Sequence, residues 1–274
     1  MGNNSKYFFD SSKKNGLYFK ELFNYKDLFY SLAWREFKVR YAQTFLGFIW
    51  AVIQPLATLL IFFFIFGKAI KVDTGNIPYP LFALSGLAAW SYFSFVISTS
   101  GRSIINESGM IKKIFFPRLV IPFSKALVGL IDFAISLVLL FLAMFYYKES
   151  LTWNLLFMPI FLFLILLISV GVGIWISALS LRYRDVQHII PFFIQIGLYA
   201  TPVAYSANEI PEKYQLIYHL LNPMAGIIEG FRWSLMASEL NLFYLFYSFI
   251  LVLCIFISSI FYFMKIEKIM ADIL

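Results

Sequence analysis

The sequence predicts an all-α polytopic membrane protein with six transmembrane helices in each protomer. Of its 274 residues, 61% are hydrophobic and 14% are charged, whereas about 25% are charged in ordinary soluble domains. Apolar runs of about 20 residues, each long enough to cross a bilayer, recur along the chain. A single large soluble domain would need polar helix faces toward water, and these runs have almost none.

The six expected spans divide the chain into three parts. The spans are 45–67, 80–100, 119–147, 153–181, 186–205 and 242–264. They form a transmembrane domain, 45–265, between an N-terminal part, 1–44, and a tail, 266–274. The first 44 residues mix charged and aromatic side chains and have no apolar core or cleavage site, so no signal peptide is expected.

Positive charge predicts the orientation. Lys and Arg gather on cytoplasmic loops, and with six spans all but five of the 22 Lys and Arg residues fall on one side: the exceptions are Lys68, Lys71, Lys148, Lys213 and Arg232. Both termini are therefore expected on the cytoplasmic side of a bacterial or archaeal cytoplasmic (inner) membrane. The net charge of +7 is interpreted in the same way, because no basic patch has the geometry to bind nucleic acid.

An amphipathic helix is expected before the first span. Polar residues recur every three or four positions, with apolar residues opposite them; the polar set is Lys20, Asn24, Asp27, Ser31, Arg35 and Lys38, and the apolar set is Leu22, Tyr25, Phe29 and Leu32. Such a helix suits the membrane interface. It is either a simple surface anchor or a lever that transmits force from a cytoplasmic partner. Lys26 and Glu36 break the pattern.

The connection between spans two and three, NESGMIKKIFFPR at 106–118, predicts a short cytoplasmic helix. Asn106 or Ser108 can cap it, and Pro117 must end or kink it. Its apolar face consists of Ile111, Ile114 and Phe115, beside Lys112 and Lys113. This pattern favours a helix that docks into a groove on another protein. The alternative is a helix that rests on lipid headgroups.

The turn between spans four and five is SLRYRDV, at 180–186. Arg182 and Arg184 fit the positive-inside bias. Asp185 is expected to cap span five at the positive end of its helix. It can also pair with an arginine of its own turn or of the N-terminal helix, and we hypothesise that this cluster braces a cytoplasmic gate.

The external segment 206–241 predicts two short re-entrant helices rather than a seventh span. Asn222–Pro223 interrupts it, and a seventh span would place the C-terminus outside. Irregular backbone at membrane depth needs shelter from protein or a water-filled cavity. Glu229 and Arg232 lie three residues apart on one helical face and can pair.

Charges and small residues inside the spans also need an interpretation. Asp132 in span three is expected to form structural hydrogen bonds or to line a cavity. A role in a proton relay is less favoured, because a relay needs several such groups. Lys125, seven residues earlier on the same face, is expected at the headgroup level. The small residues at 85–86 and 171–173 are expected to permit close helix packing.

Several kinds of chemistry find no support. The chain has no GxxxxGK[ST] loop for nucleotide phosphates. Its two histidines and one cysteine have no ligand-spaced partners, so neither a metal nor another cofactor is expected in this chain. Aromatic residues in or near spans are either interface and packing residues or rings that line a pore, where sugars stack on aromatic faces; they are Trp50, Trp90, Tyr92, Phe93 and Tyr199.

Several segments in order resemble one family. They are LAWREFKVRYAQTFLGFIWAVIQPL (32–56), GMIKKIFFPRLVIP (109–122), LRYRDV (181–186), TPVAYS (201–206) and LNPMAGIIEGFRWSL (221–235). Each is weak alone, but the ordered set is similar to the membrane subunit of the ABC-2 class of polysaccharide exporters. Such exporters move O-antigen, capsule or teichoic acid.

The resemblance implies a homodimer that binds two copies of a separate ATPase, which holds the ATP and Mg²⁺, and encloses a channel for a lipid-linked (undecaprenyl-type) polysaccharide. The short helix becomes the coupling helix, with Glu107, Met110, Ile111, Lys112, Lys113 and Phe115. The cytoplasmic gate comprises Arg35, Arg40, Arg182, Arg184 and Asp185. The external gate comprises Asn222, Pro223, Glu229 and Arg232, and the five aromatic residues named above become candidates for the glycan path.

Two alternatives stay open. An ABC-2 exporter for a small hydrophobic compound or a lipid would use the same coupling parts with a narrower route. A membrane-bound transferase would need clustered acids or a metal motif near the interface. Asp185 beside Arg182 and Arg184 is the one charged cluster of that kind, and it lacks a second acid.

Overall fold

The computed structural model describes residues 22, 24–42 and 47–270, and all regular structure among them is helical. The N-terminal residues 1–21, including Lys20 of the expected polar stripe, and the end of the tail lie outside the described residues. In chain order the elements are α2 (Lys26–Tyr41), η1 (Gly47–Ile49), α3 (Trp50–Phe62), η2 (Phe63–Ile70), α4 (Tyr79–Asn106), α5 (Ser108–Ile111), α6 (Val120–Tyr146), η3 (Trp153–Phe157), α7 (Met158–Arg182), α8 (Val186–Ala200), η4 (Ala207–Glu209), α9 (Glu212–Leu221), α10 (Pro223–Met236) and α11 (Leu242–Glu267).

Five helical stretches are long and apolar enough to cross a membrane. They are Gly47–Ile70, Tyr79–Asn106, Val120–Tyr146, Trp153–Arg182 and Leu242–Glu267, and they correspond to five of the six expected spans. The expected span 186–205 is shorter, because α8 has 15 residues. At a rise of about 1.5 Å per residue this helix covers about 22 Å, less than the hydrocarbon core of about 30 Å.

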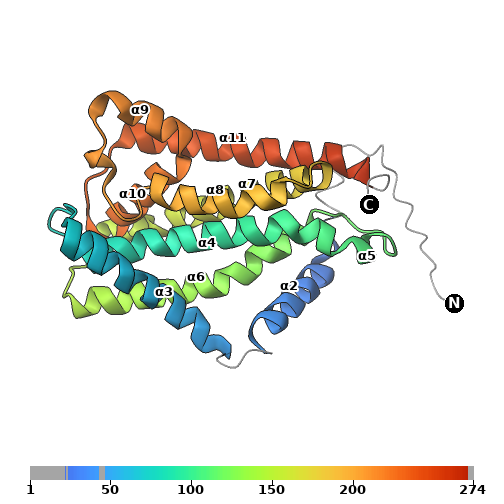
Figure 1. The fold of residues 1–274 in the computed structure, drawn as a ribbon, viewed down its shortest axis with the longest axis horizontal. Coiled ribbons are helices and arrows are strands. Elements are labelled where there is room, and N and C mark those ends of the chain that lie inside the picture. Colours follow the sequence, from blue (N-terminus) through green and yellow to red (C-terminus); the bar gives the residue numbers. More distant parts are fainter. Residues whose placement is uncertain (1–21, 23, 43–46, 271–274) are drawn as a thin grey trace.

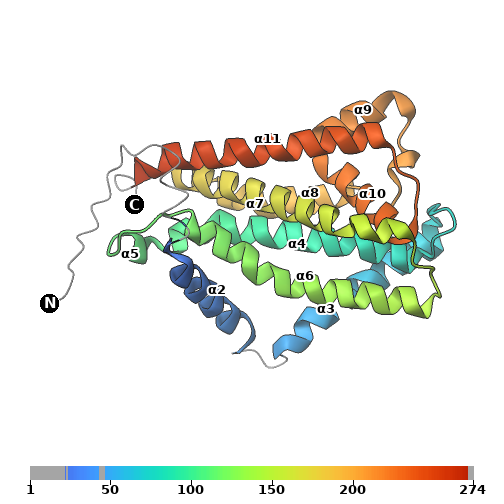
Figure 2. The ribbon, with the colours of Figure 1, turned by 180° about the vertical axis from the view of Figure 1, so that it is seen from behind.

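The long helices run along one axis of the molecule (Figures 1 and 2). The short helix α5 lies at one end of this bundle, and α9 lies at the other (Figure 1); we call these the α5 end and the α9 end. Helix α2 lies obliquely beside α6 at the α5 end, as Figure 2 shows. The two ends of the bundle therefore carry different short helices and are joined by the long apolar helices.

Helix α4 occupies the centre of the bundle and packs against α6 on one side and α7 on the other. Within its most apolar window, 78% of the residues are buried, against 28% in α11. The main apolar core surrounds it, and a second core at the α5 end joins α2, α5, the start of α6 and the ends of α7 and α11. Because α4 has protein on most sides, it is the element against which the other helices are packed.

Small residues allow the helices to approach closely, as expected from the sequence. A Cβ atom on Gly171 would lie 3.0 Å from the Cα atom of Phe256 in α11. A Cβ atom on Gly173 would lie 3.1 Å from the Cβ atom of Ser100 in α4. Any larger residue at these positions would push α7 away from its two neighbours.

The two short helices expected in 206–241 are confirmed as α9 and α10, and no single helix runs through this segment. The break falls at Asn222, and Pro223 opens α10, where its missing N–H costs nothing. At the other end of the bundle, the expected caps of the short helix were wrong. Helix α4 continues to Asn106, so Glu107 occupies the cap position of α5, and no side chain caps that helix.

Candidate functional site

The segment 107–118 forms a turn that projects from the α5 end of the bundle. Lys112 and Lys113 are exposed, as are Ile114 and Phe115, whose exposed fractions are 57% and 69%. Ile111 is 8% exposed and packs into the second core. The turn thus presents two cations and two apolar side chains to its surroundings while its inner side is fixed.

This turn is tied to neighbouring helices at both ends. Glu107, which is 8% exposed, forms an ion pair with Arg35 of α2. At the other end, the backbone N–H of Arg118 donates to Glu267 Oε1 at 2.9 Å, and its Nη1 donates to the carbonyl oxygen of Glu267 at 2.8 Å. A force on the turn is therefore passed both to α2 and to the end of α11.

Helix α2 is docked on α6 through charges as well as apolar contacts. Lys125 Nζ of α6 lies 2.6 Å from Glu36 Oε2, and only 7% of the Lys125 side chain is exposed. Helix α2 covers Lys125, so its ammonium group faces Glu36 rather than an open surface. Glu36 broke the polar stripe of its helix because it faces the protein. Removing one partner of such a pair leaves a buried charge uncompensated.

Asp132 is the second anchor for α2. It accepts a hydrogen bond from the Tyr41 hydroxyl and forms an ion pair with Arg40, whose guanidinium lies 4.3 Å from the centroid of the Phe95 ring. Burial and the hydrogen bond to Asp132 raise the pKa of Tyr41 to about 12, so its hydroxyl remains a donor at neutral pH. The structural interpretation of Asp132 agrees with this geometry.

At the α9 end, Arg232 of α10 is 2% exposed. Its guanidinium donates to the carbonyl oxygens of Phe82, Pro202 and Val203 and to Ser85 Oγ, at 2.6–3.3 Å. It also lies 3.5 Å from the centroid of the Phe82 ring. Arg232 thus joins α10 to α4 and to the connection that follows α8.

The expected pairing of Glu229 with Arg232 was wrong. Gly86 leaves room for the guanidinium beside α4, since a Cβ atom there would lie 2.6 Å from Arg232 Nη2. The guanidinium therefore reaches carbonyl oxygens rather than the carboxylate. The nearest basic group to Glu229 is His219, with Nε2 3.9 Å from Oε2. Burial raises the pKa of Glu229 to about 7, against the opposing effects of the Arg232 charge and a backbone N–H of Ala207.

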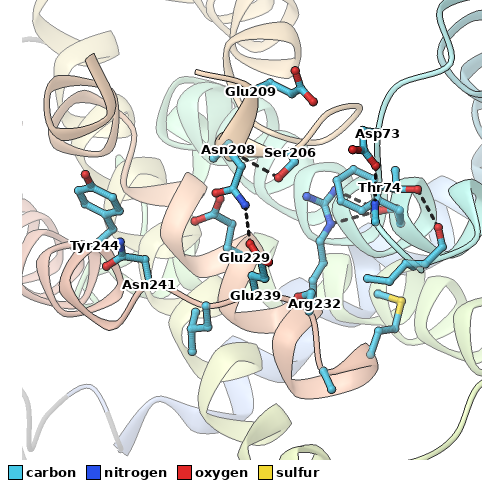
Figure 3. A pocket seen from close by; sticks show the side chains of 18 of the residues that line it. Asp73, Thr74, Ser206, Asn208, Glu209, Glu229, Arg232, Glu239, Asn241 and Tyr244 are labelled. Carbon is cyan, nitrogen blue, oxygen red and sulfur yellow. Dashed lines mark hydrogen bonds between the residues drawn. The ribbon is translucent and has the colours of Figure 1, made fainter. Parts of the chain in front are cut away.

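A cavity of about 900 Å³ opens at the same end. It lies between the loop 73–77, the segment around η4, helices α9 and α10, and the connection 236–244. Figure 3 shows Arg232 beside it, with Asp73 and Thr74 on one side and Asn208, Glu209 and Glu239 on the other. Polar side chains from four separate segments therefore converge here.

Comparison with known proteins places these features in a family. Residues 27–236 match the model of a family described as "ABC-2 type transporter". The chain belongs to the ABC-2 type transporter family. It is also 30% identical over 214 residues to the O-antigen export system permease protein RfbA of Myxococcus xanthus, covering 78% of this chain and 82% of that protein.

Two further relatives agree with this family. RfbA of Klebsiella pneumoniae is 32% identical over 78% of this chain and 82% of that protein. The polysialic acid transport protein KpsM of Escherichia coli is 24% identical over 76% of this chain and 80% of that protein. The match extends through α2, the turn at 107–118 and α10, so it includes both ends of the bundle.

The expected coupling residues of this ABC-2 chain separate into two groups. Lys112, Lys113 and Phe115 face outward, whereas Glu107 and Ile111 face the protein. Met110 is partly buried against the second core. The inner group holds the turn, and the outer group is exposed.

The residues expected at the cytoplasmic gate do not form one cluster. Arg35 and Arg40 are paired with Glu107 and Asp132. The turn with Arg182, Arg184 and Asp185 is exposed, and no hydrogen bond or ion pair joins its side chains to α2 among the described residues. Asp185 occupies the cap position of α8, but its side chain accepts no capping hydrogen bond. The expected cap was therefore wrong, because the helical backbone conformation of Asp185 continues the turn.

The five aromatic candidates also separate. Trp90, Tyr92 and Phe93 are at most 5% exposed and pack within the chain, with Tyr92 donating to the carbonyl oxygen of Ala126. Trp50 and Tyr199 keep 50% and 58% of their surface exposed. Only the latter two rings are available to a ligand or a second chain in this arrangement.

Sequence reasoning missed the partners of α2 and of Arg118. Glu36 carried a signal, since an acid on the apolar side of an amphipathic helix needs a buried partner. For Arg118 and Glu267 the local pattern gave no pairing signal, because the two residues lie 149 positions apart along the chain.

Proposed function

We propose that this chain is the channel-forming permease subunit of an ATP-driven exporter that moves a lipid-linked polysaccharide of the O-antigen, capsule or teichoic acid type across the cytoplasmic membrane. The observation that carries the proposal is the similarity, over 78% of the chain, to permeases named for O-antigen export. The similarity to a polysialic acid transport protein supports the same substrate class.

A separate ATPase supplies the energy, because the chain has no phosphate loop of its own. Two copies of this chain and two copies of the ATPase form the exporter, and ATP and Mg²⁺ bind to the ATPase. The turn at 107–118 is the coupling turn, and its outer side is the docking surface, with Lys112, Lys113, Ile114 and Phe115. The ties of the turn to α2 and α11 support this role, since they carry its movement into the bundle.

The α5 end lies in the cytoplasm, together with both termini, and the α9 end lies outside. The distribution of Lys and Arg supports this orientation. Helix α8 crosses as the fifth span, continued by the segment after Ala200. Helices α9 and α10 form the external gate, with the break at Asn222–Pro223 and the side chains of Glu229 and Arg232. The exposed rings of Trp50 and Tyr199 meet the glycan in the assembled dimer.

A clean deletion of the gene tests the substrate class. Lipid-linked polymer is expected to accumulate inside the cells while surface polymer is lost, and the wild-type gene restores it. Normal surface polymer in the deletion strain contradicts polysaccharide export. Normal surface polymer together with the loss of export of a lipid or a small hydrophobic compound favours the alternative substrate class.

Charge reversal in the coupling turn tests the docking surface. The double variant Lys112→Glu/Lys113→Glu is expected to abolish export without loss of the protein from the membrane, because the docking charges change sign. Lys213→Glu, an exposed lysine at the α9 end, is the control and is expected to export normally. Transport of polymer by the double variant at the wild-type rate contradicts the assignment.

A further inference from the structure

The cavity at the α9 end lies away from the turn that we propose as the docking surface for the ATPase. Its volume of about 900 Å³ lies within the range of about 300–1,000 Å³ that is typical of ligand pockets. It is also far from the α5 end, where the coupling turn lies (Figure 1). The lining of the cavity therefore needs its own explanation.

The lining consists of oxygen acceptors, carboxamides and a few rings. Five carboxylates contribute, from Asp73, Glu149, Glu209, Glu229 and Glu239, and four carboxamides, from Asn76, Asn208, Gln215 and Asn241. Carboxylates accept hydrogen bonds from hydroxyl groups, and carboxamides both donate and accept. The rings of Phe82, Phe243 and Tyr244 add apolar faces. This combination suits a sugar, which has hydroxyl groups around its edge and C–H groups on its faces.

Positive charge is not available to a ligand in this cavity. Arg232 is the only Lys or Arg among the lining residues, and its guanidinium is buried and donates to three carbonyl oxygens and the Ser85 hydroxyl. An anionic group would therefore meet carboxylates without a compensating cation. The charge of the lining therefore disfavours phosphates and acidic sugars.

Some polar groups of the lining have no partner in the protein. The carboxylates of Glu149 and Glu209 form no hydrogen bond or ion pair with any residue that the structure describes. His219 is 2% exposed, and its Nδ1 has no hydrogen-bond partner in that same part of the chain. An unpaired buried nitrogen is uncommon and costs free energy unless a ligand or solvent satisfies it. Its imidazole lies parallel to the ring of Tyr244, with centroids 4.3 Å apart.

A metal ion explains these groups less well than a sugar does. Within the described residues, no three His, Cys, Asp or Glu side chains come close enough together to hold one ion. The acids are instead spread around the walls, on different segments, as Figure 3 shows for Asp73, Glu209 and Glu239. Spread acceptors match the several hydroxyl groups of a sugar ring.

We propose that this cavity binds an uncharged or amine-bearing sugar unit of the exported glycan and rejects acidic sugars. The inference rests on the proposed function, since export brings the glycan to this end of the molecule. The sugar hydroxyls bond to the carboxylates and carboxamides of the walls. The cavity then acts as an exit site that holds the leading part of the polymer.

Binding to the purified full-length chain in detergent tests the proposal by saturation-transfer NMR. The probes are maltotriose, which is neutral, the trimer of glucosamine, which is cationic, and trigalacturonic acid, which is acidic. The first two are expected to receive saturation, and the third is expected to receive none. Binding of the acidic probe as strongly as the neutral one overturns the charge argument, and binding of no probe overturns the site.

Two variants place the binding in the cavity. The double variant Glu149→Gln/Glu209→Gln removes two unpaired charges and is expected to weaken the binding of the neutral and cationic probes by about fivefold or more. Glu212→Gln, an exposed acid of α9 outside the cavity, is the matched control with unchanged binding. The three proteins should unfold at the same temperature. Equal binding by all three proteins contradicts the assignment of the site.

The deletion experiment keeps this inference separate from the proposed function. If the wild-type gene restores surface polymer to the deletion strain but the purified chain binds none of the probes, the proposed export function is supported and the proposed exit site is refuted. If the deletion strain keeps normal surface polymer, the proposed function fails, whatever the probes show. A trisaccharide site that persists in that case belongs to another process.

Discussion

At the scale of single residues, burial determines which groups each charged side chain contacts. Arg232 and Glu229 lie on one helix face, and an exposed pair at this spacing attracts weakly. In the folded chain, Arg232 is surrounded by carbonyl oxygens and Glu229 faces Ala207 and His219. The carbonyl oxygens come from segments distant in the sequence, so spacing along the helix could not reveal them.

Arg232→Lys tests the anchoring of α10. An ammonium group cannot reproduce the planar set of donors that reaches three carbonyl oxygens and a hydroxyl. We expect the free energy of unfolding to fall by about 2–4 kcal/mol, because buried acceptors lose their donors. Unfolding in mixed detergents with increasing sodium dodecyl sulfate measures it. Arg184→Lys, at an exposed position, is the control, and equal stability of both variants would refute the anchor.

The raised pKa of Glu229 predicts a pH dependence. Its folded-state pKa is about 7, against 4.5 for the ordinary group. A carboxyl whose pKa is raised by folding adds stability that is complete below pH about 4.5 and is lost as the pH rises through 7. Glu229→Gln cannot ionise, so we expect it to be more stable than the wild type at pH 8 by about 1–3 kcal/mol and no more stable at pH 4.5. A constant difference between pH 4.5 and 8 contradicts this.

At the scale of elements, α2 combines surface and interior behaviour. Its exposed stripe followed from residue spacing, and the structure places Asn24, Ser31, Arg35 and Lys38 at exposed positions. Its contacts did not follow, because Glu36 pairs with a residue 89 positions away. The pattern thus predicts which side of the helix is exposed, but it does not predict which helix covers the other side.

Charge reversal across α2 and α6 tests this docking. Glu36→Lys alone and Lys125→Glu alone each place like charges together in a largely buried pair, and we expect each to lower the free energy of unfolding by about 3–5 kcal/mol. The double variant restores opposite charges and is expected to recover most of the loss. If the losses of the single variants simply add in the double variant, the two side chains do not interact.

At the scale of the whole molecule, the spans were predictable because bilayer thickness sets their length. The apolar runs gave five long helices in the expected order, and Asn222–Pro223 correctly marked the break between α9 and α10. The length of α8 was not predictable in the same way. The run continues through TPVAY to Tyr205, but the carbonyl oxygens of Pro202 and Val203 turn toward Arg232, and the helix ends at Ala200.

The crossing of α8 and the orientation of the bundle can be tested together with single cysteines. In a Cys254→Ser background, Asn208→Cys and Arg184→Cys place exposed thiols at the two ends of α8 and its continuation. A membrane-impermeant maleimide added to right-side-out vesicles of the cytoplasmic membrane is expected to label Asn208→Cys at once. It should label Arg184→Cys only after detergent opens the vesicles, since the positive charge of that end keeps it inside. Labelling of both thiols in intact vesicles would mean that α8 does not cross, and the reversed pattern would invert the bundle and place the coupling turn outside, beyond the reach of any cytoplasmic ATPase.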